Sequence, residues 1–111
     1  MSIEITTAPG KWVVRAGGAV LGESASALEL REDGYDPVIY FPRGDIAMTF
    51  LDRTDRQTTC PKKGEATYYS IVTRSTTFEN AVWSYENPKD AVSQIAGHLA
   101  FDTDQITVEQ L

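Results

Sequence analysis

The segment Thr58-Thr59-Cys60-Pro61-Lys62-Lys63-Gly64-Glu65-Ala66-Thr67-Tyr68-Tyr69 contains the one cysteine of the chain, its one pair of adjacent lysines and the start of an aromatic run. Pro61 fixes its own φ and favours extended backbone at Cys60. Gly64 tolerates a positive φ, so the residues before it are predicted to form a turn with the lysines at its tip. This turn would join an extended segment that ends at Cys60 to a strand that follows Gly64.

Short apolar runs separated by turn residues predict a mainly β, antiparallel sheet fold on both sides of this turn. Residues 11–16 and 19–22 flank Gly17-Gly18, a pattern typical of a β-hairpin whose turn needs positive φ. Proline cannot donate to an inner ladder, so the proline-bracketed run 37–42 predicts an edge strand. Further strands are predicted at residues 27–32, 46–50, 66–73 (central), 81–85 (its hairpin partner), 99–101 and 106–108.

One short helix is predicted near Pro88–Ala96. Asn87 can cap it, Pro88 suits its first position, and Gly97 can end it. Residues 1–10 are polar and end in Pro-Gly, so we expect a flexible N-terminal arm, followed by a single domain over residues 11–111. The charged run 52–57 is expected to be a loop.

Composition narrows the classes of function. The chain has 111 residues, a formal net charge of −6 and one cysteine. An acidic chain argues against a nucleic-acid partner, because binding to phosphate backbones relies on a basic surface. One cysteine excludes an intrachain disulfide, and with a single histidine it predicts no metal site and no cofactor. No apolar run could span a membrane and no signal peptide is visible, so a cytoplasmic location is expected. A monomer and a homo-oligomer both remain open.

Cys60 and Lys63 are the candidate catalytic residues. A thiol held extended beside ammonium groups can have a lowered pKa and act as a nucleophile or redox centre, with His98 as a candidate base. The alternative is a buried cysteine that acts as a small apolar residue. The sequence does not decide whether the chain is an enzyme.

A second hypothesis is a binding cleft near the Cys60–Gly64 turn. Trp83 and Tyr85 share one strand face, and Tyr68 lies on the expected neighbouring strand. With lysines at the rim, including Lys62, such a cleft would suit a small planar or anionic molecule. The alternatives are that the aromatic residues are plain core, or that they form part of a structural or protein-interaction module.

Four motifs follow one another along the chain: Tyr40-Phe41-Pro42-x-x-Asp45-Ile46, Thr59-Cys60-Pro61-x-Lys63-Gly64-x-Ala66-x-Tyr68, Ala81-x-Trp83-x-Tyr85-x-x-Pro88 and Ile95-Ala96-Gly97-x-x-Ala100-Phe101. In this order and spacing they resemble the family called domain of unknown function 427. The resemblance runs from about Lys11 to Val108 and implies a small antiparallel fold of the β-tent type. Related β-tent proteins hold zinc with cysteine pairs that this chain lacks. A nucleotidyltransferase label sometimes attached to the family would require paired carboxylates for Mg²⁺, and no such pair stands at an expected strand end.

Overall fold

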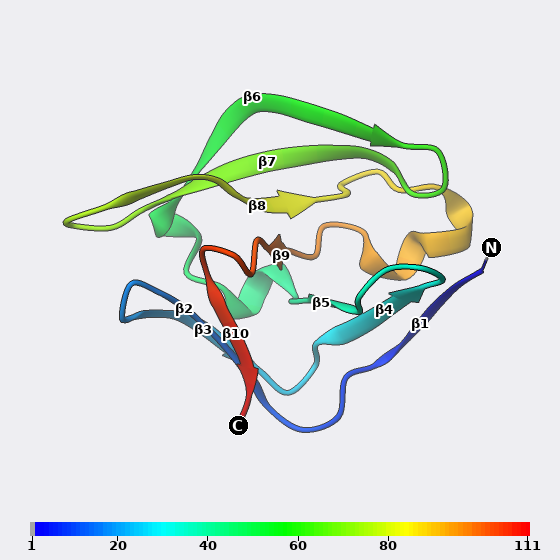
Figure 1. The fold of residues 1–111 in the computed structure, drawn as a ribbon, viewed down its shortest axis with the longest axis horizontal. Helices are drawn as coiled ribbons and strands as arrows, with labels where there is room; N and C mark the ends of the chain where they lie inside the picture. Colours follow the sequence, from blue (N-terminus) through cyan, green and yellow to red (C-terminus); the bar gives the residue numbers. More distant parts are fainter. Residues whose placement is uncertain (1) are drawn as a thin grey trace.

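The computed structural model describes residues 2–111, and these form ten strands in three antiparallel sheets (Figure 1). The sheets have the strand orders β1-β4-β5, β10-β2-β3 and β6-β7-β8-β9. The strands are β1 (Ile3–Thr7), β2 (Trp12–Ala16), β3 (Ala19–Ser24), β4 (Leu28–Glu32), β5 (Val38–Tyr40), β6 (Leu51–Cys60), β7 (Gly64–Val72), β8 (Thr77–Ser84), β9 (Ala100–Phe101) and β10 (Thr107–Gln110). Three short 3₁₀ helices accompany them: η1 (Arg43–Asp45), η2 (Met48–Phe50) and η3 (Asp90–Ile95).

The predicted mainly β, antiparallel architecture is confirmed. Gly17 and Gly18 have φ of 54° and 90°, and they close the β2–β3 hairpin as expected. β5 lies at the edge of its sheet and β7 lies inside the four-stranded sheet, both as predicted. No helix among residues 2–111 is long and apolar enough to cross a membrane.

The prediction of a loose arm is wrong for residues 3–7. They form β1, which pairs antiparallel with β4 and places Ile5 opposite Leu30. Ile3 and Ile5 are half-buried and pack against a core cluster, while Glu4 between them is exposed. The period-two alternation of this short segment was therefore a strand signal.

The predicted strand at residues 46–50 and loop at residues 52–57 are also wrong. Residues Met48–Phe50 form η2, and the charged run belongs to the ten-residue strand β6. β6 lies at the edge of the four-stranded sheet and most of its side chains are exposed. A strand that faces water on both sides has no apolar alternation to reveal it.

The predicted helix is present but is shorter and tighter than expected. It is the 3₁₀ helix η3, which begins at Asp90. The N-cap residue Lys89 provides no side-chain cap, and Val92 has non-helical φ and ψ. Gly97 follows with φ of 72°, which agrees with its predicted role in ending the helix. Six residues interrupted at Val92 are too few for a stable α-helical ladder.

The buried side chains form two clusters. The larger one packs the β2–β3 hairpin and the segment from η1 to β6 against strands β7, β8 and β9. It includes Phe41 and Phe101, whose rings meet edge to face with centroids 5.7 Å apart. The smaller one joins β4 and β5 to β7, β8 and η3, and it includes Tyr40 and Tyr85. Cys60 and Trp83 are half-buried and pack against this smaller cluster. The chemistry-bearing residues therefore border the smaller core.

β3 and η1 approach so closely that only glycine fits at residue 22. A Cβ on Gly22 would lie 2.1 Å from the carbonyl oxygen of Asp45. Two hydrogen bonds also hold this seam between β3 and η1. The Ser24 hydroxyl donates to an Asp45 carboxylate oxygen at 2.6 Å, and the Ala47 N–H donates to the Leu21 carbonyl at 2.8 Å. A side chain at residue 22 would force this seam open.

We therefore predict that Gly22→Ala lowers the free energy of unfolding by about 3 kcal/mol, the range expected when a packed interior is overfilled. Gly44→Ala is the matched control, because a Cβ there meets no atom within 4 Å. Urea denaturation of both variants measures the difference, and equal stability of the two would contradict the predicted clash.

Candidate functional site

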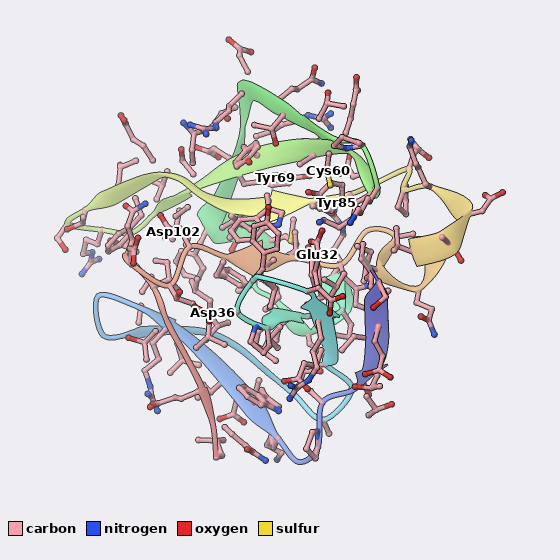
Figure 2. All side chains as sticks on the ribbon, turned by 45° about the vertical axis from the view of Figure 1, so that its right-hand side comes forward. Glu32, Asp36, Cys60, Tyr69, Tyr85 and Asp102 are labelled. Atoms are coloured by element: carbon pink, nitrogen blue, oxygen red, sulfur yellow. The ribbon has the colours of Figure 1, made fainter. Side chains whose placement is uncertain are left out.

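A cavity of about 730 Å³ lies between the four-stranded sheet and the β4–β5 hairpin. Five of the predicted site residues line it: Cys60, Lys63, Tyr68, Trp83 and Tyr85. Figure 2 shows Cys60 and Tyr85 close together above Glu32 at the end of β4, and Asp36 and Asp102 farther along. The expected convergence of the Cys60 turn and the Trp83 strand is therefore present.

The Cys60 thiol stands where β6 ends and the turn begins. The Lys63 N–H donates to the Cys60 carbonyl at 3.2 Å, and Gly64 adopts φ of 112° to begin β7. Burial raises the pKa of the thiol, but hydrogen bonds from the backbone of Lys62 and Lys63 and from the Lys63 ammonium lower it by more. The net pKa lies below its ordinary value, so the thiolate forms at a lower pH than in an ordinary cysteine.

An ion pair fixes Lys63 beside the thiol. Its ammonium donates to Glu32 at 3.1 Å, and both side chains are only 12% exposed. Burial lowers the pKa of Lys63, but hydrogen bonds to Glu32 and Cys60 raise it by more, so Lys63 stays charged. Sequence reasoning missed Glu32, because it ends a strand that lies about thirty residues from its partner.

Aromatic side chains form the walls of the cavity. The Trp83 indole N–H donates to the Tyr40 hydroxyl at 3.4 Å, which fixes the ring against β5. The Tyr68 hydroxyl lies 3.0 Å from that of Thr58, and the Arg56 guanidinium lies 4.9 Å from the centre of the Tyr68 ring. These contacts hold flat ring surfaces at the cavity wall.

The lining also includes carboxylates that the sequence analysis did not single out. Asp36, Glu79 and Asp102 line the same cavity. Asn80 stands beside Glu79 with φ of 52°, where the β7–β8 register is irregular. A β-bulge redirects side chains locally. Asparagine tolerates a positive φ, so an asparagine within a strand was the available signal of the bulge.

A second cavity of about 390 Å³ adjoins the first. Asp36, Val38, Trp83 and Asp102 line both, so they form the partition between them. The remaining lining of the second cavity is mostly apolar and includes Trp12, Pro37, Ile39, Phe101 and Val108. Trp83 thus contacts two hollows of different polarity.

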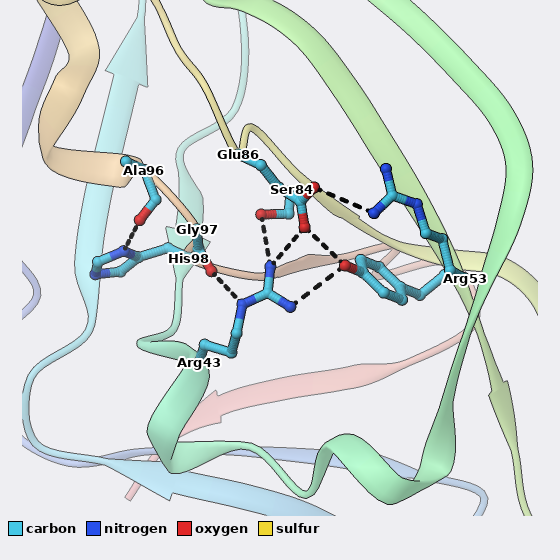
Figure 3. Close-up of polar contacts among 8 residues, drawn as sticks. Arg43, Arg53, Ser84, Glu86, Ala96, Gly97 and His98 are labelled. Atoms are coloured by element: carbon cyan, nitrogen blue, oxygen red, sulfur yellow. Dashed lines mark hydrogen bonds and ion pairs between the residues drawn. The ribbon is translucent and has the colours of Figure 1, made fainter.

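Two of the predicted site residues do not line the main cavity. The Lys62 ammonium nitrogen is sealed from solvent without a hydrogen bond among residues 2–111, and it lies 3.7 Å from the second carboxylate oxygen of Glu32. His98 follows η3 in the chain, and its Nδ1 lies 3.2 Å from the Ala96 carbonyl oxygen (Figure 3). His98 is the one histidine of the chain, so the main cavity contains no imidazole.

A separate polar network fills the space near His98. Arg43 donates to the Gly97 carbonyl at 3.1 Å and to Glu86 at 3.1 Å, and the Tyr69 hydroxyl donates to Glu86 at 2.8 Å (Figure 3). The Ser84 hydroxyl accepts a further bond from Arg43 at 3.4 Å. None of these five residues lines the main cavity, so the network supports the fold rather than the cavity wall.

The geometry around Cys60 predicts that the rate of its reaction with iodoacetamide reaches half of its maximum at a pH below 9.0, the ordinary pKa of the thiol. Lys63→Gln removes the ammonium and should shift this midpoint upward. Lys62→Gln is the matched control, because only the backbone of Lys62 lowers the Cys60 pKa. The rate measured from pH 6 to 10 gives the midpoint, and the same midpoint in all three proteins would contradict a role for Lys63.

Comparison with known proteins assigns the chain to a family. No curated protein gives a significant match. Residues 4–110 match the family model described as "Domain of unknown function (DUF427)", which covers nearly the whole chain. The motifs around Cys60, Trp83 and Gly97 all lie inside this match. The chain therefore belongs to the DUF427 family.

Proposed function

We propose that the protein binds a small planar or anionic molecule in the cavity beside the Cys60–Gly64 turn. The observation that carries this proposal is the convergence of Cys60, Lys63, Tyr68, Trp83 and Tyr85 on one hollow. The pairing of β6 with β7 and of β7 with β8 brings these residues together, with Tyr68 opposite Trp83.

The dimensions and the lining of the hollow support a small-molecule ligand. Ligand sites commonly measure roughly 300–1,000 Å³ and combine apolar walls with a few polar groups. Here Leu30 and Val38 supply apolar surface, while Trp83 supplies a ring that a planar molecule can stack against. The Lys63–Glu32 pair adds fixed polar groups at one end.

A second candidate is a thiol-assisted enzyme in which Cys60 is the nucleophile and Lys63 stabilises its thiolate. The lowered pKa of Cys60 favours it. The cavity offers no histidine as a base, so the thiolate would have to form through its contacts with Lys63 and the backbone. In both candidates the ligand occupies the same hollow.

The partner in this proposal is a small molecule, with neither nucleic acid nor a membrane involved. The net charge of −6 supports this choice, because a phosphate backbone would be repelled. A cytoplasmic location belongs to the same proposal, since a reducing compartment keeps an accessible thiol such as Cys60 free.

Ligand screening by thermal denaturation tests the proposal. A planar compound at about 100 times its Kd should raise the melting temperature by about 10 °C, because ligand bound to the native state stabilises it by about 2.7 kcal/mol. Treatment with N-ethylmaleimide should abolish this shift, because the adduct on Cys60 fills part of the cavity. Cys60→Ser treated in the same way is the control and should keep the shift. A shift that survives the adduct would place the ligand elsewhere.

A further inference from the structure

We propose that the ligand of the main cavity presents a neutral carbonyl oxygen that accepts a hydrogen bond from the Tyr85 hydroxyl, with its planar part against Trp83. This inference rests on the proposed function and narrows its ligand, planar or anionic, to a planar neutral molecule. The observation behind it is a tyrosine that is almost fully enclosed by protein but whose hydroxyl is left without a partner.

Tyr85 is 7% exposed and lines the cavity. Its hydroxyl makes no hydrogen bond to any side chain or backbone group among residues 2–111. Within the same residues, Lys62 Nζ is the one sealed side-chain polar atom without a hydrogen bond. The Tyr85 hydroxyl therefore keeps accessible surface, on a residue that lines the cavity.

The other four tyrosines differ from Tyr85 in this respect. Tyr40, Tyr68 and Tyr69 each have a side-chain hydrogen-bond partner, and Tyr35 is 69% exposed to solvent. Most buried polar groups in folded proteins are paired, because an unpaired one costs free energy. A hydroxyl kept unpaired on a cavity wall is suited to pairing with a ligand.

The Tyr85 hydroxyl offers a proton rather than a negative charge. Burial raises its pKa, and the neighbouring Tyr40 and Cys60 raise it further, so the phenol stays protonated across the neutral range. The Tyr40 hydroxyl accepts the Trp83 N–H and has its own proton left to donate. This part of the cavity therefore presents hydrogen-bond donors, which call for an acceptor oxygen on the ligand.

The charges of the lining favour a neutral acceptor over a carboxylate. Four carboxylates line the cavity against two cations, and the Lys63 ammonium is already shared between Glu32 and Cys60. An anionic ligand would meet excess negative charge, whereas a carbonyl supplies the same acceptor oxygen without that cost. The lining carboxylates are Glu32, Asp36, Glu79 and Asp102, and the cations are Arg56 and Lys63.

Two tyrosine variants test the inference with 2-naphthamide as the probe. Tyr85→Phe removes the unpaired hydroxyl and should weaken 2-naphthamide binding about tenfold, the loss of one neutral hydrogen bond. The melting temperature of the ligand-free variant should stay the same or rise, because no protein contact is lost. Chemical-shift titration gives the Kd and calorimetry gives the melting temperature.

Tyr69→Phe is the matched control, since Tyr69 is 6% exposed but donates to Glu86 outside the cavity. It should lower the melting temperature by about 5 °C or more and leave the Kd for 2-naphthamide unchanged. The two variants thus separate a hydroxyl that serves the ligand from one that serves the fold.

Several results would overturn the inference. Equal Kd values for Tyr85→Phe and the wild type would do so, as would a ligand-free Tyr85→Phe that melts several degrees lower. Tighter binding of 2-naphthoate than of 2-naphthamide would overturn the choice of a neutral carbonyl. In each case, a ligand from the thermal screen that is blocked by the Cys60 adduct would leave the proposed function standing.

Discussion

The largely buried ion pair between Lys63 and Glu32 joins two sheets at one end of the main cavity. Lys63 lies in the β6–β7 turn and Glu32 ends β4, so this one contact connects the four-stranded sheet to the sheet of β1, β4 and β5. Taking charges out of water is costly unless they are paired, and Lys62 places a second ammonium near the same carboxylate. The Lys63 carbonyl also accepts the Lys89 N–H, so the turn is attached to the segment before η3 as well. The turn is thus held from two directions.

The attachment of the turn to Glu32 and to Lys89 fixes the polar groups that the turn places at the cavity. Because Lys63 is fixed, Cys60 keeps its hydrogen-bond donors. Burial raises the pKa of the nearby phenols of Tyr40 and Tyr85, and Lys63 opposes that rise at Tyr40. The carboxylates of Asp36, Glu79 and Asp102 come instead from the β4–β5 loop, the bulged strand β8 and the segment after β9. The hollow therefore has a region rich in hydrogen-bond donors near the turn. Other elements contribute carboxylate acceptors, and Trp83 and Tyr68 form aromatic walls.

Local sequence patterns predicted the features that depend on residues close together in the chain. Gly17-Gly18 indicated its hairpin, and the alternation around Trp83 and Tyr85 placed both residues toward the same hollow. The charged strand β6 was mistaken for a loop, because an edge strand exposed on both faces has no apolar period. Residues from distant segments were also missed: no spacing rule links Glu32 to Lys63, and that contact depends on how two sheets pack. His98 and Lys62 were chosen for their side-chain chemistry, and neither lines the main cavity.

The position of the two indole rings has a spectroscopic consequence. Trp12 and Trp83 are the two tryptophans of the chain; both line the apolar hollow, and Trp83 also borders the polar one. Indole emission responds to the polarity of its surroundings, so a solute that displaces water from either hollow changes the native fluorescence of the protein. Because the chain has no other tryptophan, the wavelength of that emission reports whether the two cavities contain water or a solute.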